Sequence, residues 1–199
     1  MTMGRPRIFD VDQALDRALQ VFWQKGYEGA SLSDLTAAMG INRPSLYAAF
    51  GNKEALFRKA LDRYEAGRGG FRHEALSEPA VRTAVEQLLR GTADFLADRR
   101  NPQGCLMIQG ALACGEDAEP VRQELIARRA AGEAEIRERL ERAKAEGDLP
   151  TGLDPADFAR YLAAVLQGMA VQAASGASRE ELQQVAGLAL RVWDRDQAA

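Results

Sequence analysis

Helix-capping residues alternate with glycines along the first quarter of the chain, and this alternation constrains the fold more than any other feature. Apolar residues recur at helical spacing after Asp10, a residue type that caps helices, and Gly26 stands where that helix should end. Ser31 followed three residues later by Asp34 forms a short capping box, and Gly40 follows the next helical run. These signals predict two consecutive helices, the second of them short.

A third short helix and the start of a fourth follow directly. Asn42 can cap the third helix, and Pro44 suits its first turn because a missing N–H costs nothing there. Gly51 should end it before Asn52 caps the next helix. Two short helices joined by a tight turn that contains glycine form a helix-turn-helix. In DNA-binding examples the second helix enters the major groove, and its first residues reach the base edges.

The remaining residues continue the helical pattern. We expect a loose connection over 67–79 and helices over 81–95, 105–114, 121–146, from Pro155 behind the cap Asp154, and behind the capping box of Ser178 and Glu181. The arginine- and glutamate-rich segment Arg128–Arg142 is interpreted as a solvated face. No stretch alternates apolar and polar residues between turn signals, so the chain is predicted to be all-α.

The composition excludes several classes of protein. Two cysteines and one histidine form neither a disulfide framework nor a metal site built on a His or Cys cluster, so we expect no metal and no cofactor. The sequence has no Gly-rich phosphate loop and no nucleophile elbow, which argues against an enzyme. Neither a signal peptide nor a membrane span is recognisable, and free thiols fit a reducing cytoplasm. We therefore expect a cytoplasmic protein with no membrane partner.

Charge is distributed unevenly along the chain. The formal net charge is −3, but residues 1–68 carry ten basic and eight acidic side chains, whereas residues 69–199 carry 16 and 21. A nucleic-acid partner would therefore be met by a local patch. The candidate patch opens the second helix of the helix-turn-helix and contains Asn42, Arg43, Pro44, Ser45 and Tyr47. Among these side chains, Arg43 is the one able to bond a guanine bidentately.

Three further basic residues flank this patch. Lys53 stands in the first turn of a predicted helix, where a cation opposes the helix dipole. That placement makes sense if the helix N-terminus and the ammonium together bind one anion, and a DNA phosphate is the obvious candidate. Arg5 and Arg7 belong to an N-terminal arm without acidic residues, which could lie along the duplex or form a solvated tail.

Residues 4–61 closely resemble the N-terminal domain of the tetracycline-repressor (TetR/AcrR) family of transcriptional regulators. The resemblance rests on an A-L-x-x-F approach helix, the G-Y motif at Gly26-Tyr27, S-x-x-D at Ser31 to Asp34, and S-L-Y-x-x-F-x-N-K-E at Ser45 to Glu54. It implies a repressor that a small molecule releases from a near-palindromic DNA operator.

The resemblance also implies an organisation and a set of contacts. Each subunit of a homodimer would have a helix-turn-helix DNA-binding domain over residues 1–53, a connecting helix over 53–70, and a larger helical effector-binding and dimerisation domain over 71–199. By position, Ser33, Arg43 and Ser45 match the family's base contacts, whereas Ser31, Tyr47 and Lys53 match its phosphate contacts. Ala48 and Ala49 replace the larger residues frequent in the family, which leaves much of the readout to Arg43.

The second half resembles, less specifically, a branch of the family whose members answer diverse small molecules. Apolar residues with a few polar groups could line an effector pocket, namely Phe95, Cys105, Met107, Gln109, Phe158, Tyr161 and Gln172. A stripe on the last two helices could form the seam between subunits, namely Leu166, Met169, Val185, Leu188, Val192 and Trp193. The alternative for each pocket candidate is a place in the core or in the dimer contact.

Cys105 has two interpretations. It follows Asn101-Pro102-Gln103-Gly104, so it can lie in the first turn of a helix, where a thiolate is stabilised. The protein would then be a repressor that senses oxidants or electrophiles, as some relatives with a Gly-Cys at this place do. The alternative is a small buried apolar residue, which is the usual fate of a lone cysteine.

Overall fold

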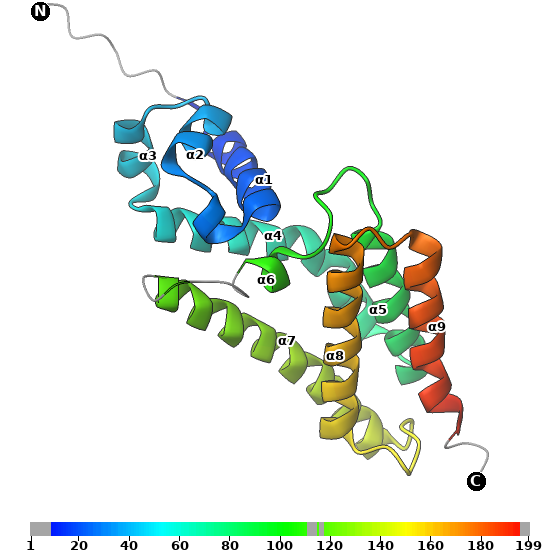
Figure 1. The fold of residues 1–199 in the computed structure, drawn as a ribbon. Coiled ribbons are helices and arrows are strands. Elements are labelled where there is room, and N and C mark those ends of the chain that lie inside the picture. The colour runs from blue at the N-terminus through cyan, green and yellow to red at the C-terminus, as the bar shows by residue number, and fades with distance from the viewer. Residues whose placement is uncertain (1–8, 111–114, 116–117, 196–199) are drawn as a thin grey trace, which may run out of the picture.

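The computed structural model describes residues 9–110, 115 and 118–195, and within those ranges its regular secondary structure is entirely helical. The helices are α1 (Val11–Gly29), α2 (Leu32–Met39), α3 (Arg43–Phe50), α4 (Lys53–Ser77), α5 (Val81–Leu96), α6 (Leu106–Gln109), α7 (Glu119–Glu146), α8 (Pro155–Ala174) and α9 (Arg179–Arg195). We call α1–α3 the N-terminal unit and α5–α9 the C-terminal unit, and α4 runs from one to the other (Figure 1). The all-α prediction is confirmed.

The first four helices begin where the capping residues predict. Asp10, Ser31, Asn42 and Asn52 each accept a hydrogen bond from the backbone N–H three residues further on, at 2.7–3.1 Å. Each bond satisfies one of the donors that a helix N-terminus leaves without an intrahelical partner. The short helices of this region are therefore fixed by contacts within one turn of sequence.

Glycines end these helices as expected, with one refinement. Gly40 has φ 69° and forms the left-handed turn that closes α2. Gly26 has φ 70° and breaks α1, but helical structure resumes beyond it as far as Gly29. Residues other than glycine rarely adopt such angles, so both turns depend on the missing side chain.

The N-terminal unit closes around aromatic and aliphatic side chains. Phe22, Leu35, Leu46 and Phe57 are fully buried, and the rings of Phe22 and Phe57 meet edge to face with centroids 4.9 Å apart. Because Phe57 belongs to α4, this contact ties α1 to the connecting helix. Leu46 and Phe50 lie one turn apart on α3, and both face inward.

The connecting helix is longer than predicted. Its expected end at residue 70 is wrong, because α4 continues to Ser77 through the stretch that the glycines marked as loose. Ala75 is buried there, and the ring of Phe71 stacks on Phe95 at 6.1 Å. Such packing outweighs the weak helix propensity of glycine, which costs about 1 kcal/mol per residue.

The C-terminal unit places α5, α8 and α9 side by side, with α7 running obliquely below them (Figure 1). The N-caps are again those expected: Asp154 caps α8, and Ser178 with Glu181 forms a capping box before α9. The helix predicted over 105–114 is reduced to the four residues of α6, and 111–114 lie outside the described residues. None of the described helices is long and apolar enough to cross a membrane.

Candidate nucleic-acid interface and ligand cavity

The first turn of α3 presents its polar residues outward. Asn42, Arg43, Pro44 and Tyr47 are exposed and Ser45 is half-buried. Behind them, Leu46 and Phe50 hold the helix to the core. This arrangement leaves the edge of α3 free to enter a groove while its opposite face fixes its direction.

Two of the predicted base-contact residues touch each other. The Arg43 guanidinium donates from Nη2 to Ser33 Oγ at 3.2 Å, which links α3 to α2. The fork of Arg43 is thereby held at the outer edge of the helix pair. The sequence could not predict this hydrogen bond, because Arg43 and Ser33 lie ten positions apart on different helices.

The Ser31 hydroxyl, which was predicted to contact a DNA phosphate, already donates a hydrogen bond within the protein. The hydroxyl and the backbone N–H of Ser31 both donate to Asp34 Oδ2, at 2.7 and 3.1 Å, to complete the capping box. Lys25 adds an ion pair to Asp34 at 2.7 Å. The hydrogen bond from Lys25 and those from Ser31 lower the pKa of Asp34 to about 2. A phosphate contact from Ser31 therefore has to compete with this carboxylate.

Lys53 begins α4 and is half-buried. Its Nζ lies 4.5 Å from the centroid of the Tyr27 ring, a cation–π contact. Burial lowers the pKa of Lys53, while the charge of Glu28 acts in the opposite direction. Tyr27 was known from sequence only as part of a motif, and the structure shows that it orients this ammonium at the helix N-terminus.

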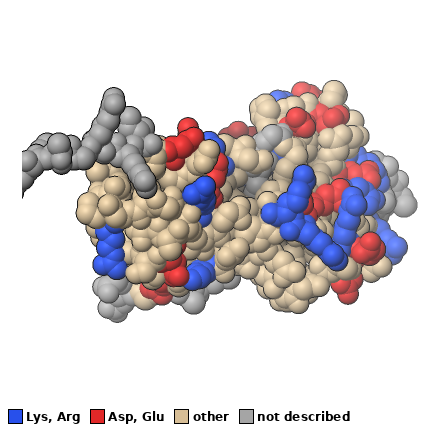
Figure 2. Space-filling model, turned by 90° about the horizontal axis from the view of Figure 1, so that it is seen from above, with Lys and Arg blue, Asp and Glu red and all other residues tan. Residues whose placement is uncertain are grey.

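The remaining basic candidates cannot be placed in the same way. Arg5 and Arg7 lie outside the described residues. On the face shown in Figure 2, basic and acidic side chains are interspersed over both units, without one broad basic region on it.

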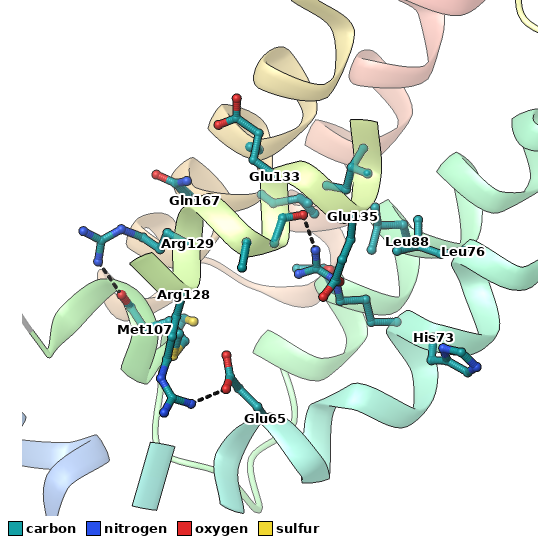
Figure 3. Close-up of a pocket in the computed structure, with 18 of the residues that line it drawn as sticks. Glu65, His73, Leu76, Leu88, Met107, Arg128, Arg129, Glu133, Glu135 and Gln167 are labelled. Atoms are coloured by element: carbon teal, nitrogen blue, oxygen red, sulfur yellow. Dashed lines mark hydrogen bonds and ion pairs between the residues drawn. The ribbon is translucent and has the colours of Figure 1, made fainter. Parts of the chain in front are cut away.

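A cavity of about 840 Å³ lies between α4 and the C-terminal unit, and residues of α4, α5, α6, α7 and α8 line it (Figure 3). Two of the predicted effector-pocket residues, Cys105 and Met107, line it. Leu166, which was assigned to the subunit seam, lines it as well. The cavity is of a size that suits a small organic molecule.

Five predicted pocket residues do not line this cavity, and this part of the prediction is wrong. Phe95 stacks on Trp23, and Phe158 stacks on Tyr161 and packs against Trp193. Gln172 is exposed, and the Gln109 side chain lies against Gly104. Periodicity identified an inner face of each helix but could not say which inner residues border a cavity and which pack on each other.

The cavity wall contributed by α7 carries arginines, so the prediction of a solvated face over Arg128–Arg142 is wrong for Arg128, Arg129 and Arg139. Most other charged residues of the segment, Arg142 among them, are exposed as predicted. Arg139 is only 4% exposed, and Arg128 is half-buried. Arg128 stands seven residues after Val121, and Arg139 stands fourteen after Leu125, spacings that return to the buried face of a helix. That spacing was the available signal. In the same helix, the apolar side chain of Ile126 is 38% exposed.

Cys105 is the N-cap residue of α6 and is 3% exposed. The Tyr64 hydroxyl donates to its Sγ at 3.2 Å. Burial fits the interpretation of a small apolar residue, whereas the position on the cavity wall fits the interpretation of a sensor.

Two hydrogen bonds connect the segments on either side of α6 to the N-terminal unit. Trp23 of α1 donates from Nε1 to the carbonyl of Gly104 at 3.2 Å, next to Cys105. Gly115 donates from its backbone N–H to Glu28 Oε1 at 2.7 Å. A movement of the segment around α6 would therefore shift or break the hydrogen bonds that this segment forms with α1.

Only some of the residues predicted to form the subunit seam are exposed on the single chain and able to contact a second subunit. Met169 and Trp193 are each 1% exposed within a single chain, so they belong to its own core and are removed from the predicted set. Val185, Leu188 and Val192 of α9 are 36–57% exposed. Val171 of α8, which the sequence did not single out, is 45% exposed. These four apolar side chains are what α8 and α9 can offer to a second subunit.

Comparison with known families matches both parts of the chain. The model described as bacterial regulatory proteins, tetR family, covers residues 14–60, and the model described as tetracyclin repressor-like, C-terminal domain, covers residues 80–187. The chain is similar to the HTH-type transcriptional repressor ComR of Escherichia coli (strain K12), with 40% identity over 193 residues, which are 96% of this chain and 91% of ComR. The uncharacterized HTH-type transcriptional regulator YezE of Bacillus subtilis is 37% identical over 55% of this chain and 57% of its own length.

Solved structures show the same similarity. A cysteine mutant of the TetR family transcriptional regulator CifR, complexed with 26-base-pair double-strand operator DNA, is 46% identical with a TM-score of 0.91, covering 95% of this chain and 100% of that one. A putative TetR transcriptional regulator from Rhodococcus sp. RHA1 is 43% identical with a TM-score of 0.62, over 92% of this chain and 98% of that one.

Proposed function

The chain belongs to the tetR family of bacterial regulatory proteins, and we propose that it is a homodimeric repressor that a small molecule in its cavity releases from a near-palindromic operator. It is a transcriptional regulator and not an enzyme. The observation that carries the proposal is the outward placement of Arg43, Pro44 and Tyr47 on α3, in a fold whose relative CifR was solved on operator DNA.

On DNA, the roles divide by chemistry. Arg43, positioned by Ser33, would read a guanine in the major groove, with Asn42 and Ser45 beside it. Tyr47 and Lys53 would hold phosphates, and the N-terminal arm with Arg5 and Arg7 would lie along the duplex. Two copies of α3 would read half-sites one helical turn apart, about 34 Å, or a multiple of it.

The second subunit would cover the exposed apolar residues of α8 and α9, namely Val171, Val185, Leu188 and Val192. A ligand in the cavity would act through α6, whose flank is bonded to Trp23, and through α4, which forms part of the wall. Release requires that the ligand bind the two conformations with different affinity, by about 1–3 kcal/mol. We expect the protein to act in the cytoplasm, where its DNA lies.

A salt-titrated binding assay on the DNA that flanks its own gene tests this function. Phosphate contacts make all DNA binding weaken with salt, so specificity appears as an affinity difference that persists through the titration. We expect this DNA to bind tighter than random DNA at every salt concentration. Equal affinity throughout would contradict the proposal.

A second candidate keeps the DNA-binding unit and makes Cys105 the sensor. It is favoured by one observation, that Cys105 lines the cavity and bonds to Tyr64. An electrophile with an activated double bond would form a C–S bond to Sγ as its double bond opens and takes up the thiol proton, and the resulting thioether would then release DNA. The test is Cys105→Ser in a DNA-release assay with an alkylating agent. A variant that responds like the unchanged protein removes this candidate.

A further inference from the structure

The charges on the cavity wall do not cancel evenly. Arg72 is paired with Glu135 at 3.0 Å, and Arg128 is paired with Asp62 at 2.6 Å, with Glu124 at 2.8 Å and also with Glu65. The other arginines that line the cavity are Arg129, Arg139 and Arg142, and no ion pair to them is found among the described residues. Of the glutamates in the wall, Glu138 alone lacks an ion pair within that part of the chain, so three unpaired cations face one unpaired acid.

Arg139 is the innermost of the three unpaired cations. It is 4% exposed, its Nη2 donates at 2.8 Å to the carbonyls of Glu78 and Pro79, and its Nη1 has no hydrogen-bond partner. A buried guanidinium without a carboxylate is costly, because two carbonyl dipoles replace only part of its hydration. The site is therefore one anion short of the arrangement that buried arginines usually have.

The second unpaired cation is half-buried. Arg129 donates from Nη1 to the carbonyl of Met107 at 2.8 Å, and burial lowers its pKa although the nearby Cys105 acts in the opposite direction. The cavity lining also includes apolar residues, among them Leu88, Ile108 and Ile136. The cavity thus combines a positive wall with room for a hydrophobic body.

We propose that this cavity binds an organic carboxylate with an apolar body, and that Arg139, supported by Arg129 and Arg142, recognises its charge. A guanidinium matches the two oxygens of a carboxylate, and the apolar wall suits the remainder of such a molecule. The inference rests on the proposed function, because it names the chemical class of the effector for that same cavity.

The geometry also indicates what binding would change. Arg139 Nη1 is closed to solvent, so an anion reaches it only if the guanidinium turns or a wall side chain moves aside. Turning would weaken the bonds to Glu78 and Pro79, which follow the last residue of α4. Because α4 begins beside α3 and ends at these carbonyls, the anion would alter the helix that carries the DNA-binding unit.

Calorimetric titration of the unmodified protein tests the charge preference with 2-naphthoate, 2-naphthamide and 2-naphthylmethylammonium, which share one apolar body. We expect naphthoate to bind about 10- to 100-fold more tightly than the amide, the range that a charge-assisted hydrogen bond supplies, and the cation to bind most weakly. Decanoate against decanol repeats the comparison with a flexible body. If acid and neutral partner bind equally in both pairs, the proposal is overturned.

Two variants then assign the preference to a residue. Arg139→Gln should lower naphthoate affinity at least tenfold and leave amide affinity unchanged. Arg137→Gln is the matched control, because Arg137 lies on the same helix, is exposed, and pairs with Glu141 away from the cavity wall. Equal loss of acid and amide binding in Arg139→Gln would show a merely structural role and overturn the assignment.

If Arg139→Gln does not fold, the double variant Arg129→Gln/Arg142→Gln replaces it, since it leaves the bonds to Glu78 and Pro79 in place. A reduced naphthoate preference supports the positive wall, and an unchanged preference overturns it. Operator retention measured in parallel separates the two proposals. Release of DNA only by neutral or cationic compounds would overturn the carboxylate proposal but not the proposed repressor function. Carboxylate binding by a protein that binds no operator would overturn the repressor function but not the carboxylate proposal.

Discussion

The N-terminal and C-terminal units use polar residues in opposite ways. In the N-terminal unit, capping side chains bond to backbone groups three residues away, and the residues that would meet DNA point outward. In the C-terminal unit, arginines point to a cavity, and their partners lie far along the chain, as with Arg139 and Glu78, which are 61 positions apart. A surface for a large partner can thus be built from local signals, whereas a cavity for a small one depends on long-range packing.

The largest effect should come from removing an anchor behind the exposed face of α3. Leu46→Ala leaves a void in a fully buried site and should destabilise the protein by about 2–5 kcal/mol, with loss of DNA binding. Ala48→Ser, on the exposed side of the same helix, should change stability by less than about 0.5 kcal/mol. Thermal unfolding of both variants measures the contrast, and similar costs would show that α3 does not have the inner and outer faces described.

The next effect concerns the seam that α8 and α9 would form. Leu188 is 57% exposed in the single chain, so Leu188→Asp should leave the fold intact while a dimer that buries it loses about 2 kcal/mol or more. Sedimentation velocity should show a shift from dimer to monomer. Gln20→Asp, at an exposed polar position on α1 and away from α8 and α9, is the control. A dimer unaffected by Leu188→Asp would place the subunit contact elsewhere.

Specificity should depend on a single exposed arginine. Arg43→Ala should cost about 1–3 kcal/mol on the operator and relax the preference at one base position. Ser33→Ala should give a smaller loss at that same position, because Ser33 holds the Arg43 guanidinium. Binding to a set of operators substituted one base pair at a time measures both variants. If Ser33→Ala relaxed a different position, Ser33 would be a reader in its own right.

Lys53 should contribute equally to the affinity for every DNA sequence. If Lys53 holds a phosphate as proposed, Lys53→Ala should weaken binding to specific and random DNA equally and reduce the slope of affinity against salt by about one. Lys59→Ala is the matched control, since Lys59 is exposed one turn and a half further along α4. A selective loss on the operator alone would show that Lys53 contributes to base readout rather than to a phosphate contact.

What the sequence predicted follows the same division between the two units. The caps at Ser31 and Asn42 and the buried pair Leu46 and Phe50 were predictable, because each depends on residues within one turn. The cavity was not, because Arg139 looks like any helix-surface arginine until its bonds to the end of α4 are known. Likewise the glycines before Phe71 predicted a loose segment, whereas packing on Phe95 keeps it helical.

The smallest effect tests how local the capping network of α2 is. Lys25 and Ser31 lower the pKa of Asp34 from 3.8 to about 2, so the folded state favours the charged carboxylate more than the unfolded chain does. A group with a lowered pKa stabilises the protein above its unfolded pKa, and this contribution is lost as the pH falls through its folded pKa. The contribution of Asp34 should therefore be complete above about pH 4 and disappear towards about pH 2. Lys25→Gln should raise the carboxylate pKa more than Ser31→Ala does, because Lys25 is the larger cause. An NMR titration of the Asp34 side-chain carbon in each variant measures this order, and the reverse order would mean that the capping box, rather than the ion pair with α1, sets the charge of α2.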